Sequence, residues 1–184
     1  YFYSYFLIDD NEKPINFSVP TGNFGDVYAG YLAKKIGLPI NKFIVATNQN
    51  DILHRAITNG SYNVENVLET ISPSMDIQIA SNFERLIFDL NNHNDKKTIE
   101  VMRSIKEKGK YKIQKELLDK INVDFLSSRM DEKEILNTIK RVYEKFNNIL
   151  DPHTAIGYGA FDKVNLKGNN IVLATAHPCK FPDA

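Results

Sequence analysis

A repeated order of elements constrains the fold most: a short apolar run, then small polar residues, then a helical pattern. The apolar runs are residues 15–19, 43–46 and 171–174, and small polar residues follow each of them at once. Runs of this length without alternation are typical of strands buried on both faces, because helices cover both sides of a parallel sheet. The sequence therefore predicts three parallel strands.

A helix is predicted between the first two runs. Residues 24–36 carry Tyr28, Tyr31 and Ile36 at helical spacing, and Gly37 follows as the stop. Strand, helix and strand together predict a βαβ unit. We therefore expect an α/β fold in which a parallel sheet has flanking helices.

The middle of the chain, residues 76–150, is predicted to consist almost entirely of helices and their connections. Its clearest helix begins at Asp131, whose carboxylate can cap the helix while Glu134 reaches back from the third helical position. An apolar stripe follows along that helix. We therefore expect a helical segment between two parts of one α/β domain, residues 1–75 and 151–184.

A further helix is predicted to begin at Asp151 as the cap, with Pro152 at the first helical position, where its missing donor is harmless. Gly157 and Gly159 lie within this helix. Glycines there indicate that another backbone or side chain approaches the helix closely.

The overall charge argues against a polyanionic partner. Lys and Arg number 23, as do Asp and Glu, so the formal net charge is zero and no overall field attracts a nucleic acid or an anionic membrane. The basic residues between 103 and 120 are interrupted by Glu107, Glu116 and Asp119. This mixture favours a solvated helical face over a nucleic-acid site.

Cysteine content and hydropathy favour a cytoplasmic protein. Cys179 is the only cysteine, which excludes an intrachain disulfide and a cysteine-based zinc site. No apolar run approaches the roughly 20 residues that a membrane helix needs. The sequence does not begin with methionine, and residues 1–8 are typical of an element already under way. We therefore expect a piece of a longer protein.

The junction after the first strand, residues 19–26, carries the clearest chemistry. Gly22 and Gly25 allow a tight turn and let backbone N–H groups face a ligand. These donors lie at the positive end of the next helix, which favours an anion such as a phosphate group. Asn23 can add a side-chain amide and Thr21 a hydroxyl. The pattern is neither a dinucleotide fingerprint nor a P-loop, and a plain turn without a ligand is the alternative.

Polar residues also follow the last predicted strand. Thr175 and His177 lie where ligands bind in open parallel sheets, although a helix cap and a hydrogen-bonded imidazole are the competing interpretations. His153 is expected to be exposed, as the second residue of its helix, and Cys179 to be structural. No spacing of histidines or carboxylates predicts a metal site.

Six blocks of the sequence carry a resemblance to a known family. They read VPTGNFGD (19–26), ATNQNDIL (46–53), SPSMDI (72–77), SNFER (81–85), DPHTA (151–155) and ATAHP (174–178). In this order they resemble threonine synthase, of the longer class found in many bacteria and in fungi. The resemblance covers nearly the whole chain and corresponds to less than half of a typical member, namely the later part.

The resemblance implies a fold type II enzyme that depends on pyridoxal 5'-phosphate, a lyase that converts O-phospho-L-homoserine and water to L-threonine and phosphate. In that family a glycine–asparagine loop holds the cofactor phosphate, which corresponds here to Gly22, Asn23, Phe24 and Gly25. A hydroxyl near the last strand faces the pyridine nitrogen in this fold type, and Thr175 matches it best. The cofactor then acts as an electron sink.

The family's Schiff-base lysine lies in its earlier half, and nothing in this chain matches that block. No catalytic residue is therefore assigned here, and the chain alone is expected to be inactive. Lys180 as a substitute is disfavoured against a solvated lysine. Gln49 stands where an acidic residue is expected, and Arg85 is a candidate contact of a substrate phosphate. Ser74 and Asp76 receive no role.

Two alternatives stay open. One is another fold type II enzyme that carries out β-replacement on serine derivatives, against which the blocks around Asp76 and Asp151 count. The other is a non-catalytic phosphate-binding or assembly module that keeps the sheet without the chemistry. If the chain belongs to an enzyme with a reactive intermediate, we expect a mobile element within residues 76–150 that controls access of water.

Overall fold

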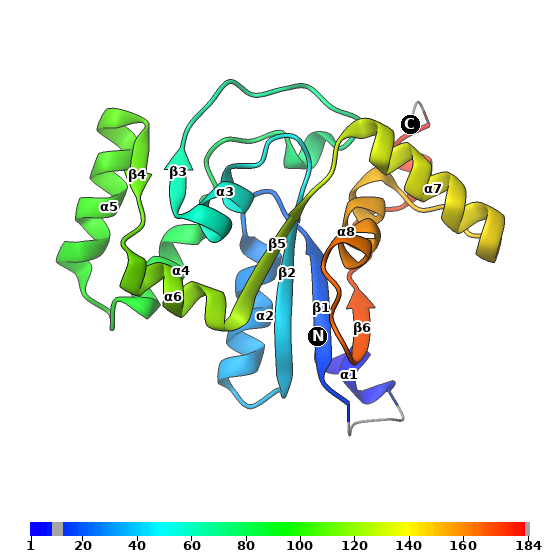
Figure 1. Ribbon diagram of the computed structural model, residues 1–184, viewed down its shortest axis with the longest axis horizontal. Helices are drawn as coiled ribbons and strands as arrows, with labels where there is room; N and C mark the ends of the chain where they lie inside the picture. Colours follow the sequence, from blue (N-terminus) through cyan, green and yellow to red (C-terminus); the bar gives the residue numbers. More distant parts are fainter. Residues whose placement is uncertain (9–12, 183–184) are drawn as a thin grey trace.

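The computed structural model describes residues 1–8 and 13–182, and a four-stranded parallel sheet forms its centre (Figure 1). The strand order is β5-β2-β1-β6, and each strand runs parallel to its neighbour. A separate two-stranded antiparallel ribbon pairs β3 with β4. The strands are β1 Ile15–Pro20, β2 Ile40–Thr47, β3 Ser61–Asn63, β4 Lys110–Lys112, β5 Phe125–Arg129 and β6 Asn169–Val172.

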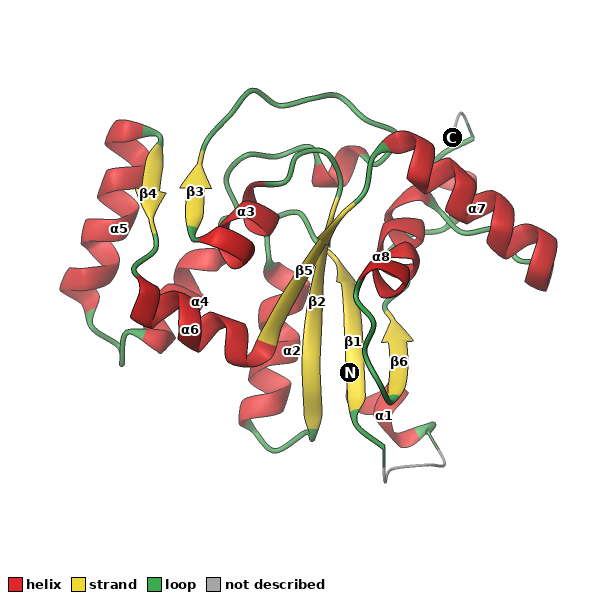
Figure 2. Cartoon of the chain, viewed as in Figure 1, coloured by secondary structure: helices red, strands yellow, loops and turns green. Residues whose placement is uncertain are grey.

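Helices cover both faces of the parallel sheet (Figure 2). Phe17 and Phe43 pack on one face with buried residues of α2, α3 and α4, whereas Ile44 and Ala46 pack on the other with α7 and α8. No helix in the described ranges is long and apolar enough to span a membrane. The helices are α1 Phe2–Phe6, α2 Gly25–Lys35, α3 Ile52–Asn59, α4 Phe83–Leu90, α5 Asp95–Lys108, α6 Lys115–Asp124, α7 Glu132–Phe146 and α8 Pro152–Lys163, with short 3-10 turns η1 Pro73–Met75 and η2 Pro178–Lys180.

The predicted α/β fold with a flanked parallel sheet is confirmed, and the first two predicted strands are β1 and β2. The third predicted strand, 171–174, lies two residues earlier, as β6. Its last hydrogen bond to β1 runs from Leu173 N–H to the Ser18 carbonyl at 3.0 Å, and Ala174 is exposed. The apolar pattern thus continues past the point where pairing ends.

The predicted helices after β1 and at residue 152 are also confirmed, as α2 and α8. Gly37 ends α2 in a conformation with φ +111°, which favours glycine. Asp151 caps α8. At Gly157 a Cβ would lie 3.0 Å from both Pro20 and Val172; the helix therefore approaches the sheet as closely as its glycines predict.

The largely helical middle of the chain also contains two short strands, β4 and β5, that the sequence analysis did not predict. Strand β5 joins the main sheet beside β2, where the Phe125 ring stacks on Phe43 with centroids 5.5 Å apart. The strand is short and includes Ser127 and Ser128, so an apolar pattern could not reveal it. The division at residues 76 and 150 stays a proposal, and its middle part supplies an edge strand of the sheet.

Helix α7 begins with the predicted capping box. Asp131 Oδ1 accepts from the Glu134 N–H at 2.8 Å, and Glu134 Oε2 accepts from the Asp131 N–H at 2.9 Å. Replacing Asp131 by alanine removes an acceptor from the helix start and should lower the free energy of unfolding by about 1 kcal/mol. Urea unfolding measures this, with exposed Lys140→Ala as control; equal stability of Asp131→Ala and the wild type would contradict it.

Asp89 connects α4 to α2. Its carboxylate accepts hydrogen bonds from the Tyr31 hydroxyl, from Lys35 Nζ at 2.8 Å and from His93 Nε2 at 3.0 Å. Burial alone would raise the pKa of Asp89, but the hydrogen bonds from Lys35, Tyr31 and His93 outweigh it and lower the pKa to about 2. The carboxylate is therefore more acidic in the folded chain than in the unfolded one.

This difference predicts a pH-dependent contribution to stability. Because the folded pKa lies below the unfolded value of about 4, Asp89 stabilises the fold above pH 4, and the contribution is lost as the pH falls from about 4 to about 2. Asp89→Asn should flatten this part of the pH profile of the unfolding free energy, whereas exposed Asp119→Asn should not. Identical profiles for Asp89→Asn and the wild type would contradict the prediction.

Candidate functional site

The candidate site lies at the carboxyl edge of the parallel sheet. Strands β1, β2, β5 and β6 all point the same way, so the segments that follow them meet at one edge. Gly22, Asn23, Phe24 and Gly25 lie directly after β1, and Thr175 lies three residues after the end of β6. The fold thus places all five predicted contacts on the side where ligands bind to such sheets.

Aromatic packing and side-chain hydrogen bonds hold the loop after β1. Phe24 adopts φ +69°, and its buried ring contacts Phe83 and Phe125 with centroids 5.3 and 5.7 Å away. Asn23 Oδ1 accepts from the Gly25 N–H at 2.9 Å, and the Asn23 carbonyl accepts from the Asn82 N–H at 3.0 Å. The loop is therefore fixed before any ligand binds.

Three amide groups of this loop are open to a ligand. The N–H groups of Gly22, Asn23 and Phe24 have no hydrogen-bond acceptor among the described residues. They precede α2, whose N-terminus carries partial positive charge. Backbone donors at a helix N-terminus form a ready site for a phosphate or carboxylate group. The chemistry of this donor set fits an anion, as the sequence predicts.

Gly22 also makes a close contact that no other residue type allows. A Cβ on Gly22 would lie 2.7 Å from the carbonyl oxygen of Ser74, so a side chain here would push the loop and η1 apart.

The neighbouring Thr21 does not act as predicted. Its hydroxyl donates to the Val19 carbonyl at 2.5 Å and is buried, so it has no hydrogen left for an anion.

Thr175 is exposed at the same edge. Its N–H donates to Thr154 Oγ1 at 3.3 Å, which attaches the segment after β6 to α8. The Thr175 side chain is therefore open to a ligand, while its backbone is held. Of the other predicted residues in this segment, His177 and Lys180 are exposed.

Cys179, which was expected to be structural rather than a nucleophile, is exposed. Its backbone N–H, not its thiol, contacts His177 Nδ1 at 3.3 Å, so the two side chains form no nucleophilic pair.

Arg85, in the first turn of α4, is exposed, and its role stays a prediction. In residues 1–8 and 13–182, His, Cys, Asp and Glu form no group of three or more that could hold a metal ion.

His153 is buried, which corrects the expectation that it is exposed. It is 4% exposed and Asp151 1%. Asp151 Oδ1 accepts from His153 Nδ1 at 3.0 Å, and His153 Nε2 accepts from the Ser74 N–H at 3.3 Å. Burial would raise the pKa of Asp151, but hydrogen bonds from His153 and Thr154 lower it. The only signal in the sequence was the scarcity of charge along α8, because a helix buried on every side lacks a polar face.

Asp76 and Asn48 hold η1 against the end of β2. Asp76 Oδ1 accepts from Asn48 Nδ2 at 2.7 Å and from Asn50 Nδ2 at 2.9 Å, while its Oδ2 accepts from the Thr70 N–H at 2.8 Å. Two of these contacts join Asp76, directly after η1, to the turn after β2, and the third joins it to the segment before η1. Asp76, which received no role from the sequence, therefore positions Ser74 beside Gly22.

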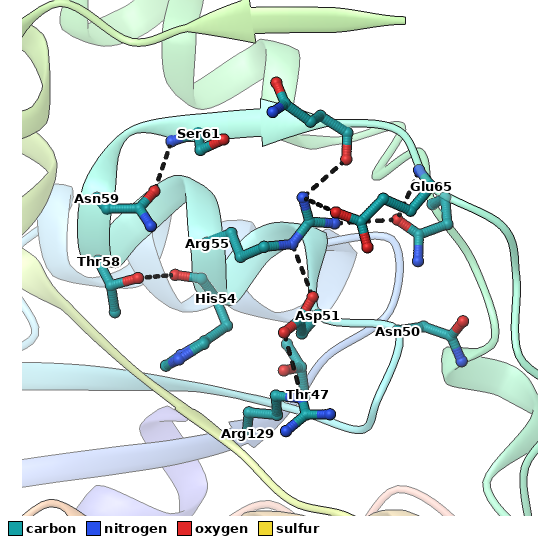
Figure 3. A network of polar contacts seen from close by, with 12 residues as sticks. Thr47, Asn50, Asp51, His54, Arg55, Thr58, Asn59, Ser61, Glu65 and Arg129 are labelled. Carbon is teal, nitrogen blue, oxygen red and sulfur yellow. Dashed lines mark hydrogen bonds and ion pairs between the residues drawn. The ribbon is translucent and has the colours of Figure 1, made fainter.

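A network of ion pairs lies beside the neighbouring strand ends, as Figure 3 shows. Asp51, at the start of α3, accepts from Arg55 Nε at 2.7 Å and from Arg129 Nε, at the end of β5, at 3.2 Å. Arg55 also pairs with Glu65 at 2.9 Å. The network thus connects α3, β5 and the long segment between β3 and η1. Gln49, two residues before Asp51, is half-buried.

Comparison with known proteins shows which protein family this chain is similar to. The family described as "Threonine synthase, C-terminal" matches residues 154–184. The threonine synthase of Pseudomonas aeruginosa is 42% identical over 186 residues, which are 100% of this chain and 40% of the relative. That of Saccharomyces cerevisiae is 44% identical over 205 residues, again 100% of this chain and 40% of the relative. This chain thus spans about 40% of the length of the curated relatives it matches.

A solved structure gives the same result in three dimensions. The crystal structure of PLP-bound threonine synthase from Brucella melitensis superposes with a TM-score of 0.95 at 43% identity. The match covers 99% of this chain and 39% of that one. The arrangement of strands, loops and helices described above is therefore shared with a threonine synthase over nearly the whole chain.

Proposed function

The chain belongs to the threonine synthase family, and from that premise we propose that it is the later part of an enzyme that converts O-phospho-L-homoserine and water to L-threonine and phosphate. Homologues identical at 42% and 44% over the full chain support the family assignment. The reaction class, a lyase that releases phosphate, and a cytoplasmic location belong to this proposal. The proposed substrate is a small molecule, and the proposal includes no nucleic-acid or membrane partner.

The proposed cofactor is pyridoxal 5'-phosphate, and the residues present fit it. The amides of Gly22, Asn23 and Phe24 before α2, unpaired among the described residues, carry the proposal, because consecutive backbone donors at a helix N-terminus suit the oxygens of a phosphate group. With Gly25, which allows the helix to start beside them, these residues are assigned to the cofactor phosphate. The glycine at position 22 lets the loop approach the Ser74 carbonyl of η1, where a Cβ would lie 2.7 Å from that oxygen.

Thr175 is assigned to the nitrogen of the cofactor ring. Its side chain is exposed at the same edge as the loop and its backbone is held by Thr154. A neutral hydroxyl can donate or accept there without placing a charge beside the ring. When bound, the cofactor supplies an electron sink that lets the substrate lose protons and its phosphate.

The amine that anchors the cofactor is not assigned to this chain. Lys180 lies in η2 and is exposed beside Phe181 and Pro182, as a solvated lysine would be. We propose that the earlier part of the full-length protein supplies the lysine, as the resemblance implies. In that arrangement this chain binds and orients the cofactor, and the chemistry needs both parts.

The proposal is tested on the full-length protein that carries this chain. Addition of pyridoxal 5'-phosphate should produce a cofactor absorbance band, and O-phospho-L-homoserine should then release inorganic phosphate and yield threonine. The same assay without cofactor is the control. Cofactor binding without phosphate release would favour another enzyme of the same fold type, and absence of both would leave a non-catalytic module.

A further inference from the structure

A buried pair that the proposed function does not use connects the two proposed cofactor contacts. The loop Gly22–Gly25 and Thr175 lie on different segments of the carboxyl edge, and no hydrogen bond between described residues joins them directly. Both are instead linked to the start of α8. Asp151 and His153, the cap and the second residue of that helix, are at the centre of the connection.

The first arm runs from Asp151 to the phosphate loop. His153 Nε2 accepts a hydrogen bond from the Ser74 N–H at 3.3 Å. Because an N–H group can only donate, Nε2 must be the ring nitrogen without a proton. The ring proton then lies on Nδ1, 3.0 Å from Asp151 Oδ1. The carboxylate therefore selects the tautomer that holds Ser74. The carbonyl of Ser74 in turn limits the space at Gly22, where a Cβ would lie 2.7 Å from it.

The second arm runs from the same carboxylate to Thr175. The Thr154 hydroxyl donates to Asp151 Oδ2 and receives the Thr175 N–H at 3.3 Å. A hydroxyl has one hydrogen, so its donation to Asp151 leaves a lone pair facing Thr175. The two oxygens of Asp151 thus set the hydrogen-bond direction in both arms. Packing of the His153 ring on Phe181, with centroids 4.8 Å apart, keeps the pair away from water.

We propose that Asp151 and His153 are positioning residues that, through Ser74 and Thr154, fix the separation between the phosphate-binding loop and Thr175. The inference rests on the proposed function, since the separation matters only if one cofactor spans both contacts. The pair does not touch the cofactor; it acts through Ser74 and Thr154 on the residues that do. Loss of one arm should therefore disturb one end of the bound cofactor and leave the other unchanged.

Two variants of the full-length holoenzyme separate the arms. His153→Phe keeps a ring against Phe181 but cannot accept from Ser74, and Thr154→Val keeps the shape but removes the hydroxyl. The ³¹P NMR resonance of bound pyridoxal 5'-phosphate reports on the phosphate end, and its absorbance spectrum reports on the ring end. Thermal unfolding of each variant measures general stability, and His153→Gln, whose Oε1 can still accept from Ser74, serves as the conservative rescue.

We expect His153→Phe to shift the ³¹P resonance and to weaken cofactor affinity about tenfold, with the absorbance band unchanged and with His153→Gln close to the wild type. Thr154→Val should shift the absorbance band and leave the ³¹P resonance unchanged. If both signals change together in proportion to lost thermal stability, or if neither changes, Asp151 and His153 only stabilise the start of α8 and the inference is wrong. If His153→Phe does not fold, Thr154→Val and His153→Gln still decide between these outcomes. A wild-type protein that binds no cofactor would overturn the proposed function instead, and this inference with it.

Discussion

Replacing Gly22 by alanine should weaken the affinity for pyridoxal 5'-phosphate about a hundredfold. The new Cβ would lie 2.7 Å from the Ser74 carbonyl oxygen, a distance that backbone atoms cannot tolerate without moving. Ser74 cannot withdraw easily, because His153 holds its N–H and Asp76 is hydrogen-bonded to Asn48 and Thr70. The loop must therefore shift and lose some of its amide contacts with the phosphate, each of which is worth roughly 1.5–3 kcal/mol when the acceptor is charged.

A fluorescence or absorbance titration of the full-length protein with the cofactor measures this change. The matched control is Gly109→Asn, at the end of α5. Gly109 has φ +66° and nothing within 4 Å of its Cβ position, and asparagine tolerates that conformation. The control should bind the cofactor as the wild type does. An affinity of Gly22→Ala within about threefold of the wild type would show that the loop is not a tight cradle.

Replacing Gly168 by alanine should destabilise the fold by about 3 kcal/mol or more. Gly168 precedes β6 with φ +110°, and a Cβ there would lie 2.0 Å from the Pro14 carbonyl oxygen. The same oxygen accepts the Asn169 N–H at 2.8 Å, so it cannot move without breaking the first contact of β6 with the segment before β1. The substitution therefore combines backbone strain with a clash at a strand junction.

Urea unfolding measures the loss, and Asn165→Ala, an exposed site in the same connection, is the control. The control should change the free energy of unfolding by less than about 0.5 kcal/mol. A loss below about 1 kcal/mol in Gly168→Ala would mean that β6 docks on β1 more loosely than the structure shows. Because β6 leads into Thr175, the variant should also bind the cofactor less tightly.

The local parts of the fold could be predicted from the sequence. The strand, loop and helix of residues 15–36 follow from an apolar run, two glycines and a helical repeat, and all three signals lie within one short stretch. The start of α7 is similar, because the partners of its capping box, Asp131 and Glu134, are three residues apart. The helix N-terminus after β1 indicates an anion site for the same reason, since the donors belong to consecutive residues.

The parts that depend on distant contacts could not be predicted. His153 is buried because it contacts Asp151, Ser74 of η1 and Phe181 of the segment after β6. No spacing in the sequence shows that these residues meet. Strand β5 was missed because the packing of Phe125 on Phe43, rather than a long apolar run, holds it in the sheet. The Thr21 hydroxyl was considered as a further donor to the anion because its hydrogen bond to the Val19 carbonyl cannot be predicted without the turn geometry.

We propose that the loop of residues 22–25 binds the phosphate of pyridoxal 5'-phosphate. A crystal structure of the full-length protein grown with this cofactor would locate the phosphate group. We expect the phosphate oxygens to lie within about 3 Å of the amide nitrogens of Gly22, Asn23 and Phe24, with the Thr175 hydroxyl at the ring nitrogen. A cofactor phosphate bound elsewhere, with these amides hydrogen-bonded to protein atoms, would show that the loop is not the phosphate site.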